Sequence, residues 1–432
     1  MRLLIIGAGP GGYETAVEAA RRGMEVTLIT EGPLGGTCLN EGCIPTKTFC
    51  HYAELIEQNR KAGFDISPDL AGVAARKNAV IEQLRGGIDS LLRGVTVVSG
   101  KASLKDAHTV VANGQEYSAE KIIIATGSKP ALLPIPGAET AMTSGQVLNL
   151  TQVPASICVI GGGVIGLELA SVFKSFGSEV TVLEYCKEIL PRFDVDLAKR
   201  LRQALGKRGI RIETQAQVTA VDGGTVRYIR KDAECTVQAE LVLMAVGRIA
   251  NTDGLNLEAA GVEYGRRGIV VDRNFRTSVP DIYAVGDVTG GMMLAHVATY
   301  QGLRALNDIE GKSDNIRFDI VPAAVFTMPE AATVGLTEEE CKERGVTVRC
   351  LKSFYRANGK AVSMDESDGY CKIIVSAGDE RILGCHLMGA HSSDLIHEIA
   401  AMLNMNATLQ DVRCMIHAHP TLAEVIQSAI HQ

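Results

Sequence analysis

Two stretches of the chain repeat one pattern: an apolar run, a glycine-rich turn, a stretch of small and apolar residues, and a second apolar run. Apolar runs of about four to eight residues between turn signals are typical of buried strands in a parallel sheet. The predicted strand, helix and strand fall at 3–6, 13–22 and 26–29 in the first copy and at 157–160, 167–176 and 180–184 in the second. The pattern therefore predicts two βαβ units, each at the start of a Rossmann-like α/β domain.

Two further apolar runs end in a glycine turn, at Lys121–Pro130 and Leu241–Gly247. Each is predicted to be a buried strand that closes the sheet of its own unit. From about Val321 onward the chain alternates strands and helices with no further glycine-rich turn; strands are expected at 371–375 and 382–388, and helices at 392–403 and 421–430. This change predicts a separate α+β domain at the end of the chain.

The length of 432 residues supports a division into several domains. A single hydrophobic core stops growing at about 250–300 residues, and longer chains split. We expect a first nucleotide-binding domain at 1–143, a second at 144–270, a central segment at 271–318 and a C-terminal domain at 319–432.

Composition and charge exclude several classes of protein. Hydrophobic residues make up 46% and charged residues 22% of the chain, as in an ordinary globular protein, which excludes a disordered or collagen-like chain. The formal net charge of −7 gives no basic surface for nucleic acid or anionic lipid. No apolar run reaches the about 20 residues of a membrane-spanning helix, and Met1 leads directly into a predicted strand rather than a signal peptide. We therefore expect a cytoplasmic protein with no nucleic-acid or membrane partner.

The glycines of the two turns indicate what the repeated units bind. The spacing G-x-G-x-x-G holds Gly7, Gly9 and Gly12 in the first turn and Gly161, Gly163 and Gly166 in the second. Glycine lets the backbone approach a pyrophosphate closely, and the following helix presents free N–H groups and a partial positive charge to that anion. One match is weak, but two, each between a predicted strand and a predicted helix, indicate two dinucleotide sites.

Two cysteines, Cys38 and Cys43, follow the first unit in the segment GGTCLNEGCIPTK. In a regular helix their Cα atoms would lie about 8.6 Å apart, beyond the roughly 4.4–6.8 Å that a disulfide accepts, so bridging them needs a distorted turn, which Gly42 can supply. A bridge across so short a loop adds little stability, which favours a redox role over a structural one. Two unrelated thiols remain the alternative; zinc is disfavoured because no second Cys/His pair lies nearby at ligand spacing.

Together with the first glycine turn, this cysteine segment resembles the flavin-dependent pyridine nucleotide-disulfide reductases, and within that family the dihydrolipoamide dehydrogenases. The likeness continues in AVGD at 284–287, LAHVATYQG at 294–302, VPAAVFTMPEAATVGLTEEE at 321–340 and HAHPTLAE at 417–424. It implies FAD on the first domain, with the central segment completing that site, NAD on the second domain, and a C-terminal domain that forms a homodimer. It also implies that the chain oxidises a dihydrolipoyl group on a protein of a 2-oxoacid dehydrogenase or glycine cleavage system and reduces NAD+.

The resemblance assigns roles to single residues. It implies that Cys38, as the exposed member of the pair, exchanges with the substrate dithiol, and that Cys43 lies against the flavin. Lys47 and Glu168 are expected as a pair beside the flavin ring, where a cation favours the reduced form; the alternative is a surface lysine and an ordinary helical glutamate. Further FAD contacts are expected from Thr126, Gly127, Gly286, Asp287, Leu294 and Ala295, and an NAD contact from Gly247.

A candidate base lies near the end of the chain. His419 is predicted just outside a helix that begins at Pro420 or Thr421, with Glu424 one turn in. A carboxylate that accepts a hydrogen bond from one ring nitrogen fixes the tautomer and leaves the other nitrogen as a base for a thiol. The position alone suits a cap or a surface residue, but the resemblance implies that His419 is the base and that the partner subunit supplies it, so that the active site is shared across the dimer interface. His417 is expected to be structural.

Two carboxylates are candidates for binding ribose hydroxyls. Glu184 ends the second strand of the second unit, where a carboxylate binds the ribose of NAD and repels the 2′-phosphate of NADP. Lys187 and Arg192 lie slightly downstream and could meet a phosphate, but we expect the carboxylate to dominate. In the first unit Thr30 holds the usual position and Glu31 follows it, which leaves the direction of the side chain open. We favour Glu31 for the FAD ribose.

Three other flavin enzymes fit the sequence less well. Glutathione reductase is disfavoured by Glu184 and by the HPTLAE segment, and mercuric reductase because no cysteine follows Cys414. A soluble transhydrogenase would lack one cysteine of the pair. Outside the enzymes, the chain could be a flavin-binding subunit of a larger complex without turnover.

Overall fold

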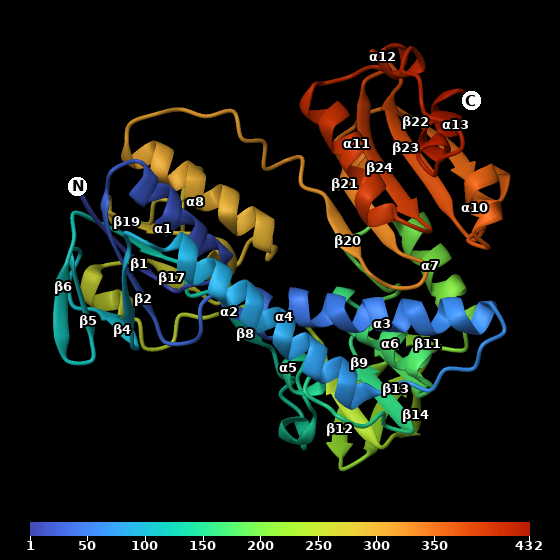
Figure 1. Cartoon of the computed structure of the whole chain (residues 1–432), viewed down its shortest axis with the longest axis horizontal. Coiled ribbons are helices and arrows are strands. Elements are labelled where there is room, and N and C mark those ends of the chain that lie inside the picture. Colours follow the sequence, from blue (N-terminus) through green and yellow to red (C-terminus); the bar gives the residue numbers. More distant parts are fainter.

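The computed structural model describes all residues from 1 to 432, and its first repeated unit forms a parallel sheet in the order β19-β7-β1-β2-β3 (Figure 1). The strands are β1 (Arg2–Ile6), β2 (Glu25–Thr30), β3 (Thr96–Ser99), β7 (Lys121–Ile124) and β19 (Ile282–Ala284). Leu3 and Ile5 pack with the helices α1 (Pro10–Arg21) and α8 (Ala295–Ile309). Leu4 and Ile6 face the small antiparallel sheet of β4 (Ala102–Leu104), β5 (Thr109–Ala112) and β6 (Gln115–Ser118). Because both faces are covered, the strands are continuous apolar runs.

The second unit forms a parallel sheet in the order β11-β10-β9-β15. Its strands are β9 (Ser156–Ile160), β10 (Glu179–Glu184), β11 (Arg211–Thr214) and β15 (Leu241–Met244). Val180 and Val182 share a core with the helices α6 (Val164–Phe176) and α7 (Val195–Lys207). The other face packs against the antiparallel strands β12 (Gln217–Asp222), β13 (Thr225–Arg230) and β14 (Ala233–Gln238).

The last part of the chain forms an antiparallel sheet in the order β20-β21-β24-β23-β22. These strands are β20 (Ala323–Val325), β21 (Ala331–Gly335), β22 (Val348–Phe354), β23 (Tyr370–Ser376) and β24 (Ile382–Met388). The helices α11 (Ser392–Asn404) and α13 (Glu424–Ile430) pack against this sheet, and together they enclose the hydrophobic core of the C-terminal domain.

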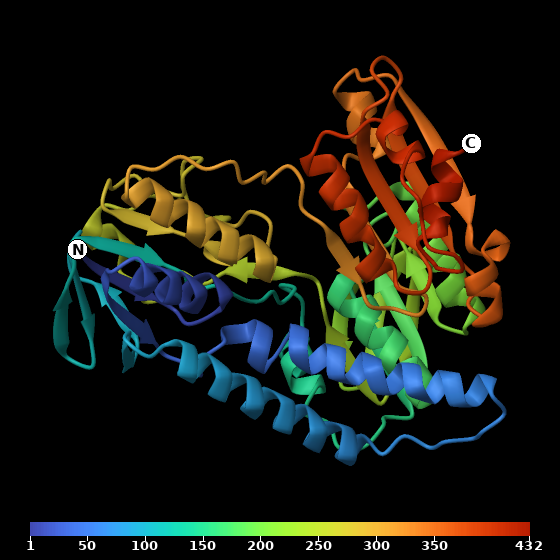
Figure 2. The ribbon, with the colours of Figure 1, turned by 45° about the horizontal axis from the view of Figure 1, so that its top comes forward.

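Two connections join the first domain to the second. The helix α3 (Cys43–Lys61) begins beside the first sheet and extends over α6, with α4 (Leu70–Leu91) beside it (Figure 2). A two-stranded antiparallel ribbon of β8 (Ser128–Pro130) and β16 (Arg248–Ala250) pairs the segments that follow β7 and β15. Both connections place parts of the first domain next to the second nucleotide fold.

The remaining elements are short. They are α2 (Gly36–Asn40), α5 (Ser144–Val147), α9 (Glu338–Glu343), α10 (Gly359–Ser363), α12 (Leu409–Arg413), β4 (Ala102–Leu104), β5 (Thr109–Ala112), β6 (Gln115–Ser118), β17 (Tyr264–Gly265) and β18 (Gly268–Ile269). No helix combines the length and the apolar character that crossing a membrane requires.

The predicted fold class is confirmed: two parallel α/β sheets and a C-terminal α+β domain. The expected strand Lys121–Pro130 is divided, because the chain turns at Gly127, with φ of +73°, between β7 and β8. The first sheet is closed at its edge by β19, not by β7. The last helix begins at Glu424, not at Pro420 or Thr421. The domain boundaries at 143, 270 and 318 stay predictions.

Candidate functional site

One large cavity, with a volume of about 2700 Å³, runs between the glycine turns of the two parallel sheets. Most of the residues predicted to bind cofactors line it, together with the two predicted catalytic cysteines, although they come from segments far apart in the sequence. They are Gly7, Gly9, Glu31, Cys38, Cys43, Lys47, Thr126, Gly127, Gly161, Gly163, Glu168, Glu184, Gly247, Gly286, Asp287, Leu294 and Ala295. Ligands of open α/β sheets bind at the carboxyl ends of the strands, and these residues lie there.

The glycine turns fit a pyrophosphate. Gly9 and Gly163 are the N-cap residues of α1 and α6, and no side chain caps either helix. Pro10 has no N–H group, but other backbone N–H groups of each first turn can bind an anion. A Cβ atom at either glycine would meet no neighbour, because both face open space. Gly12 and Gly166 do not line the cavity; a Cβ atom there would overlap the carbonyl oxygen of Gly7 or Gly161. The third glycine of each turn thus lets the helix pack closely on the turn.

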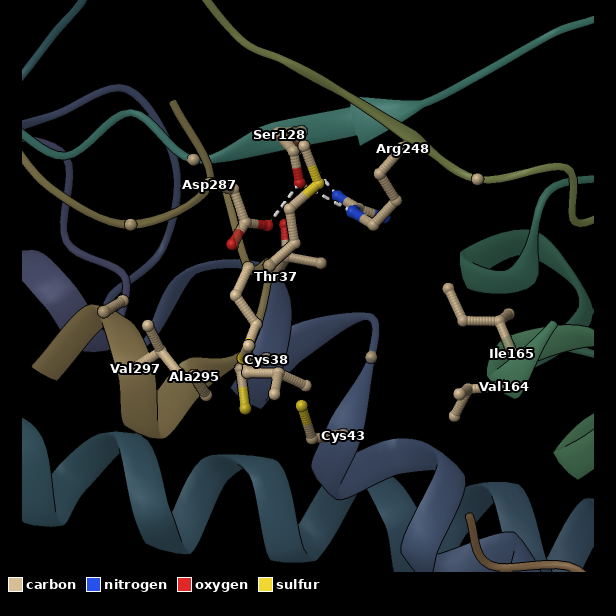
Figure 3. A pocket seen from close by; sticks show the side chains of 18 of the residues that line it. Thr37, Cys38, Cys43, Ser128, Val164, Ile165, Arg248, Asp287, Ala295 and Val297 are labelled. Atoms are coloured by element: carbon tan, nitrogen blue, oxygen red, sulfur yellow. Dashed lines mark hydrogen bonds between the residues drawn. The ribbon is translucent and has the colours of Figure 1, made fainter. Parts of the chain in front are cut away.

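The two cysteines lie on successive helices and face one another (Figure 3). Cys38 belongs to α2, and Cys43 is the first residue of α3, so the chain leaves helical geometry between them, as their spacing requires. Both are free thiols. Cys38 is half-buried, whereas Cys43 is exposed to the open cavity. Because the resemblance implies that the flavin covers Cys43, the exposure of Cys38 to the substrate stays a prediction.

The electrostatics of the pair favour a thiolate on Cys43. A hydrogen bond from the Cys38 thiol, together with the nearby Lys47 ammonium, outweighs the partial desolvation of the Cys43 sulfur at the cavity wall and lowers the pKa of Cys43 to about 7. The same hydrogen bond, together with burial, raises the pKa of Cys38 far above that of an ordinary thiol. A thiolate is the reactive form of cysteine in nucleophilic attack and charge donation.

Lys47 and Glu168 form an ion pair beside the cysteines. The Lys47 Nζ atom lies 2.9 Å and 2.8 Å from the two carboxylate oxygens of Glu168, and 4.2 Å from the centre of the Phe326 ring. Glu168 is buried and also accepts a hydrogen bond from the Phe326 N–H, at 3.0 Å. Burial acts to lower the pKa of Lys47, but the Glu168 carboxylate outweighs it and the pKa is raised. The lysine is therefore a fixed cation on the cavity wall rather than a surface side chain.

Two polar residues of the cavity were missed by sequence reasoning. The Ser128 hydroxyl donates to Asp287 Oδ2 at 2.5 Å, and Arg248 donates through Nε to Ser128 Oγ and through Nη2 to Ser128 O, both at 2.7 Å (Figure 3). Since the serine oxygen accepts from the guanidinium, its proton is directed to the carboxylate. Both residues directly follow the glycine that ends a predicted strand, Gly127 or Gly247, and this position was the available signal.

The candidate ribose carboxylates differ in how they are held. Glu184 is buried at the end of β10, lines the cavity, and accepts hydrogen bonds from the N–H groups of Gly162 at 2.5 Å and Cys186 at 2.7 Å. In the first unit the Thr30 hydroxyl donates to Gly32 O at 2.9 Å, while Glu31 is exposed, and both line the cavity. Glu184 is thus fixed by the backbone before any ligand binds.

His419 and Glu424 form the predicted hydrogen-bonded pair, with 2.9 Å between Nδ1 and Oε1. The Thr421 N–H also donates to Glu424, at 2.8 Å, and these two hydrogen bonds lower the pKa of the carboxyl group. Glu424 bonds back to the turn before it, which explains why α13 begins at this residue. The His419 side chain is 78% exposed, and neither His419 nor Glu424 lines the cavity. The side chain of His417 is 7% exposed, and its Nε2 atom lies 2.8 Å from Glu398 Oε1. Within one chain, the candidate base does not meet the cysteines.

Comparison with protein families matches residues 1–302 to the pyridine nucleotide-disulphide oxidoreductases and residues 321–430 to the dimerisation domain of the same group. The chain belongs to this family. Among similar curated proteins are the dihydrolipoyl dehydrogenases of Geobacillus stearothermophilus, 40% identical over 99% of this chain and 94% of that protein, and of Chlamydia muridarum, 41% identical over 98% and 94%.

Solved structures also superpose on nearly the whole chain. LpdA from Mycobacterium tuberculosis superposes with a TM-score of 0.91 at 30% identity, covering 100% of this chain and 99% of that one. The HOCl-induced flavoprotein disulfide reductase RclA from Escherichia coli superposes with a TM-score of 0.90 at 31% identity, covering 100% and 99%.

Pyridine nucleotide-disulfide oxidoreductases use FAD and NAD, and the cavity fits both. Two helix ends without a side-chain cap suit two pyrophosphates, Glu184 suits a ribose, and the thiol pair and Lys47 line the same cavity. The site thus has room and partners for two dinucleotides, with a pair of thiols on its wall.

Proposed function

We propose that this chain is a dihydrolipoyl dehydrogenase, an FAD-dependent enzyme that oxidises dihydrolipoyl groups and reduces NAD+. The observation that carries the proposal is the Cys38–Cys43 pair, which opens into the same cavity as both glycine turns. The choice of a dihydrolipoyl group as the substrate rests on the names of curated relatives, which are about 40% identical over almost the whole chain. A flavin-binding subunit without turnover would not need a reactive thiolate, so the lowered pKa of Cys43 favours the enzyme over this alternative.

In the proposed reaction, a disulfide between Cys38 and Cys43 accepts two electrons. One sulfur of the dihydrolipoyl group attacks Cys38 and releases Cys43 as a thiolate; the second sulfur then displaces Cys38, leaving a lipoyl disulfide and the reduced cysteine pair. FAD supplies the redox chemistry that carries the two electrons onward to NAD+, giving NADH. The cavity-facing position and low pKa of Cys43 support its place on the flavin side.

A base must remove the proton of the attacking thiol, and we assign this role to His419 of the partner subunit in a homodimer. Its imidazole is exposed, oriented by Glu424, and absent from the cavity of its own chain. The match of residues 321–430 to the family's dimerisation domain supports the assignment. The active site is then complete only in the dimer.

The remaining assignments belong to the same proposal. Glu31 binds the FAD ribose, because the neighbouring Thr30 hydroxyl is already bonded to Gly32 O. Asp287 binds the ribityl chain of FAD, and Glu184 binds the ribose of NAD. We place the enzyme in the cytoplasm, where a lipoyl-bearing protein of a 2-oxoacid dehydrogenase or glycine cleavage system is its partner.

Two parallel assays on the purified FAD-bound protein test the proposal. We expect fast NAD+ reduction with dihydrolipoamide and little NADPH oxidation with glutathione disulfide. The Cys38→Ser variant should lose the first activity, whereas Cys414→Ser, which removes an exposed thiol outside the cavity, should keep it. Turnover with glutathione disulfide alone would assign the chain to another disulfide reductase. No turnover with either substrate would favour the non-catalytic subunit.

A further inference from the structure

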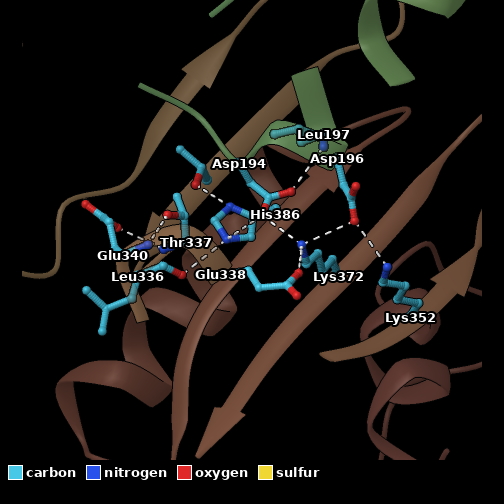
Figure 4. Close-up of polar contacts among 11 residues, drawn as sticks. Asp194, Asp196, Leu197, Leu336, Thr337, Glu338, Glu340, Lys352, Lys372 and His386 are labelled. Atoms are coloured by element: carbon cyan, nitrogen blue, oxygen red, sulfur yellow. Dashed lines mark hydrogen bonds and ion pairs between the residues drawn. The ribbon is translucent and has the colours of Figure 1, made fainter. Parts of the chain in front are cut away.

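A buried cluster of charged residues lies between the second nucleotide domain and the dimerisation domain (Figure 4). At its centre, Lys372 of β23 is 1% exposed, and its Nζ atom is 2.9 Å from Asp194 Oδ2. Asp194 is 0% exposed and caps α7 through a hydrogen bond from the Leu197 N–H to Oδ1. Two outer carboxylates, Glu338 at 2.7 Å and Asp196 at 3.4 Å, are about half exposed. The buried part of the cluster is therefore a single ion pair across the domain boundary.

His386 does not share the charge of this pair. Its Nε2 atom lies 3.2 Å from Leu336 O and its Nδ1 atom 2.6 Å from the Thr333 hydroxyl, so the ring donates through Nε2 and accepts at Nδ1. Complete burial lowers the pKa of His386 to about 4. The ring is neutral, and Lys372 is the only cation that contacts Asp194.

Asp194 directly follows a turn that lines the cavity. Residues 190–193 all face the cavity, and Leu190 donates its N–H to Gly162 O of the second glycine turn, at 3.0 Å. The turn is closed by a hydrogen bond from the Phe193 N–H to Leu190 O, at 2.8 Å. One end of the turn is thus fixed to the glycine turn and the other, through Asp194, to the dimerisation domain.

Stability alone does not account for the pair. A buried ion pair is in general no more stabilising than apolar side chains of the same volume, but it allows only one geometry. We propose that Lys372 is a positioning residue for the nicotinamide dinucleotide: through Asp194 it fixes the cavity-lining turn 190–193, so that the dimerisation domain contributes to nucleotide affinity. This inference rests on NAD binding at the second sheet and not on the identity of the dithiol substrate.

The test is the dissociation constant of NADH, measured by calorimetry on the dimeric FAD-bound protein after flavin and disulfide have been fully reduced under anaerobic conditions, so that NADH binds without transferring hydride. Asp194→Asn removes the charge but keeps the helix cap, because asparagine caps as well as aspartate. We expect it to weaken NADH binding by about 2- to 30-fold, the range of mutations that disturb such couplings. Lys372→Met should do the same. The FAD content, read from the visible spectrum, should not change.

The double variant Asp194→Asn/Lys372→Met keeps the test valid if Lys372→Met alone does not fold, because it leaves no unpaired buried charge. Its NADH affinity should equal that of Asp194→Asn alone, since the two residues act as one pair. Lys352→Met, which removes a half-exposed partner of Asp196, is the control and should bind NADH normally. Unchanged NADH affinity in Asp194→Asn with a lowered melting temperature would show that the pair only holds the domains together. A further loss in the double variant, or an equal loss in Lys352→Met, would also overturn the inference.

Discussion

The pKa of Cys43 can be changed through its neighbour. The thiol of Cys38 donates the hydrogen bond that contributes most to lowering this pKa to about 7. Serine at position 38 keeps a donor, whereas alanine removes it. We therefore expect the pKa of Cys43 to stay near 7 in Cys38→Ser and to rise by about one to two pH units in Cys38→Ala, as is typical when a hydrogen bond to the charged form is lost.

The difference is large at neutral pH. With a pKa of about 7, half of Cys43 is thiolate at pH 7. With the pKa of an ordinary thiol, about 8.5, the fraction is about 3%. Adding Lys47→Met to Cys38→Ser removes the second cause and should also raise the pKa. The thiolate is present above the pKa and is lost as the pH falls through it.

Two measurements report the thiolate. In the FAD-bound protein, a Cys43 thiolate beside the oxidised flavin should give a long-wavelength absorption band that grows as the pH rises through about 7. The rate at which iodoacetamide alkylates the Cys43 peptide should follow the same curve. Equal midpoints in Cys38→Ser and Cys38→Ala would refute the hydrogen bond as the cause. A band in Cys43→Ser and none in Cys38→Ser would reverse the roles of the two cysteines.

Three further predictions concern the base and the cofactors. His419→Gln should reduce dihydrolipoamide turnover by about 10²- to 10⁴-fold while FAD stays bound, and Glu424→Ala should have a smaller effect; near-normal turnover would exclude His419 as the base. The enzyme should have a much higher kcat/KM for NADH than for NADPH, and Glu184→Gln should narrow the gap; equal values in the unmodified protein would mean that the carboxylate does not select the nucleotide. Ser128→Ala leaves Asp287 without its hydroxyl donor and should weaken FAD binding about tenfold or more in equilibrium dialysis, whereas unchanged retention would show that the carboxylate needs no such support.

The local sequence pattern was sufficient to predict the two nucleotide-binding folds. The apolar runs and glycine turns predicted both ends of the strands β1, β2, β9 and β10 to within one residue. These elements are set by interactions within about 30 residues, namely hydrophobic periodicity and turn chemistry. The Lys47–Glu168 pair came from resemblance, and the structure places the two side chains in contact.

Other features depend on contacts that local pattern does not contain. β19 has three residues, Ile282–Ala284, and becomes a strand only because β7 offers it an unpaired edge. Ser128 and Arg248 are 120 positions apart, and neither belongs to a recognisable motif. The predicted start of α13 was wrong because a proline is a strong signal for the first turn of a helix. In the structure the helix begins at Glu424, whose carboxylate accepts a hydrogen bond from the Thr421 N–H in the preceding turn.

The place of β19 in the first sheet also sets an order of events during synthesis. The nascent chain delivers β7 at residue 124 but its edge partner only at residue 282, after the whole second sheet has been made. At about 5–20 residues per second, that interval lasts about 8–30 s. The second domain, whose strands lie together between residues 156 and 244, can therefore fold before the first is finished. Until β19 is made, β7 is an unpaired edge strand to which strands of other chains can pair. Several ribosomes that translate one messenger RNA hold such unfinished chains close together, which favours aggregation at this strand.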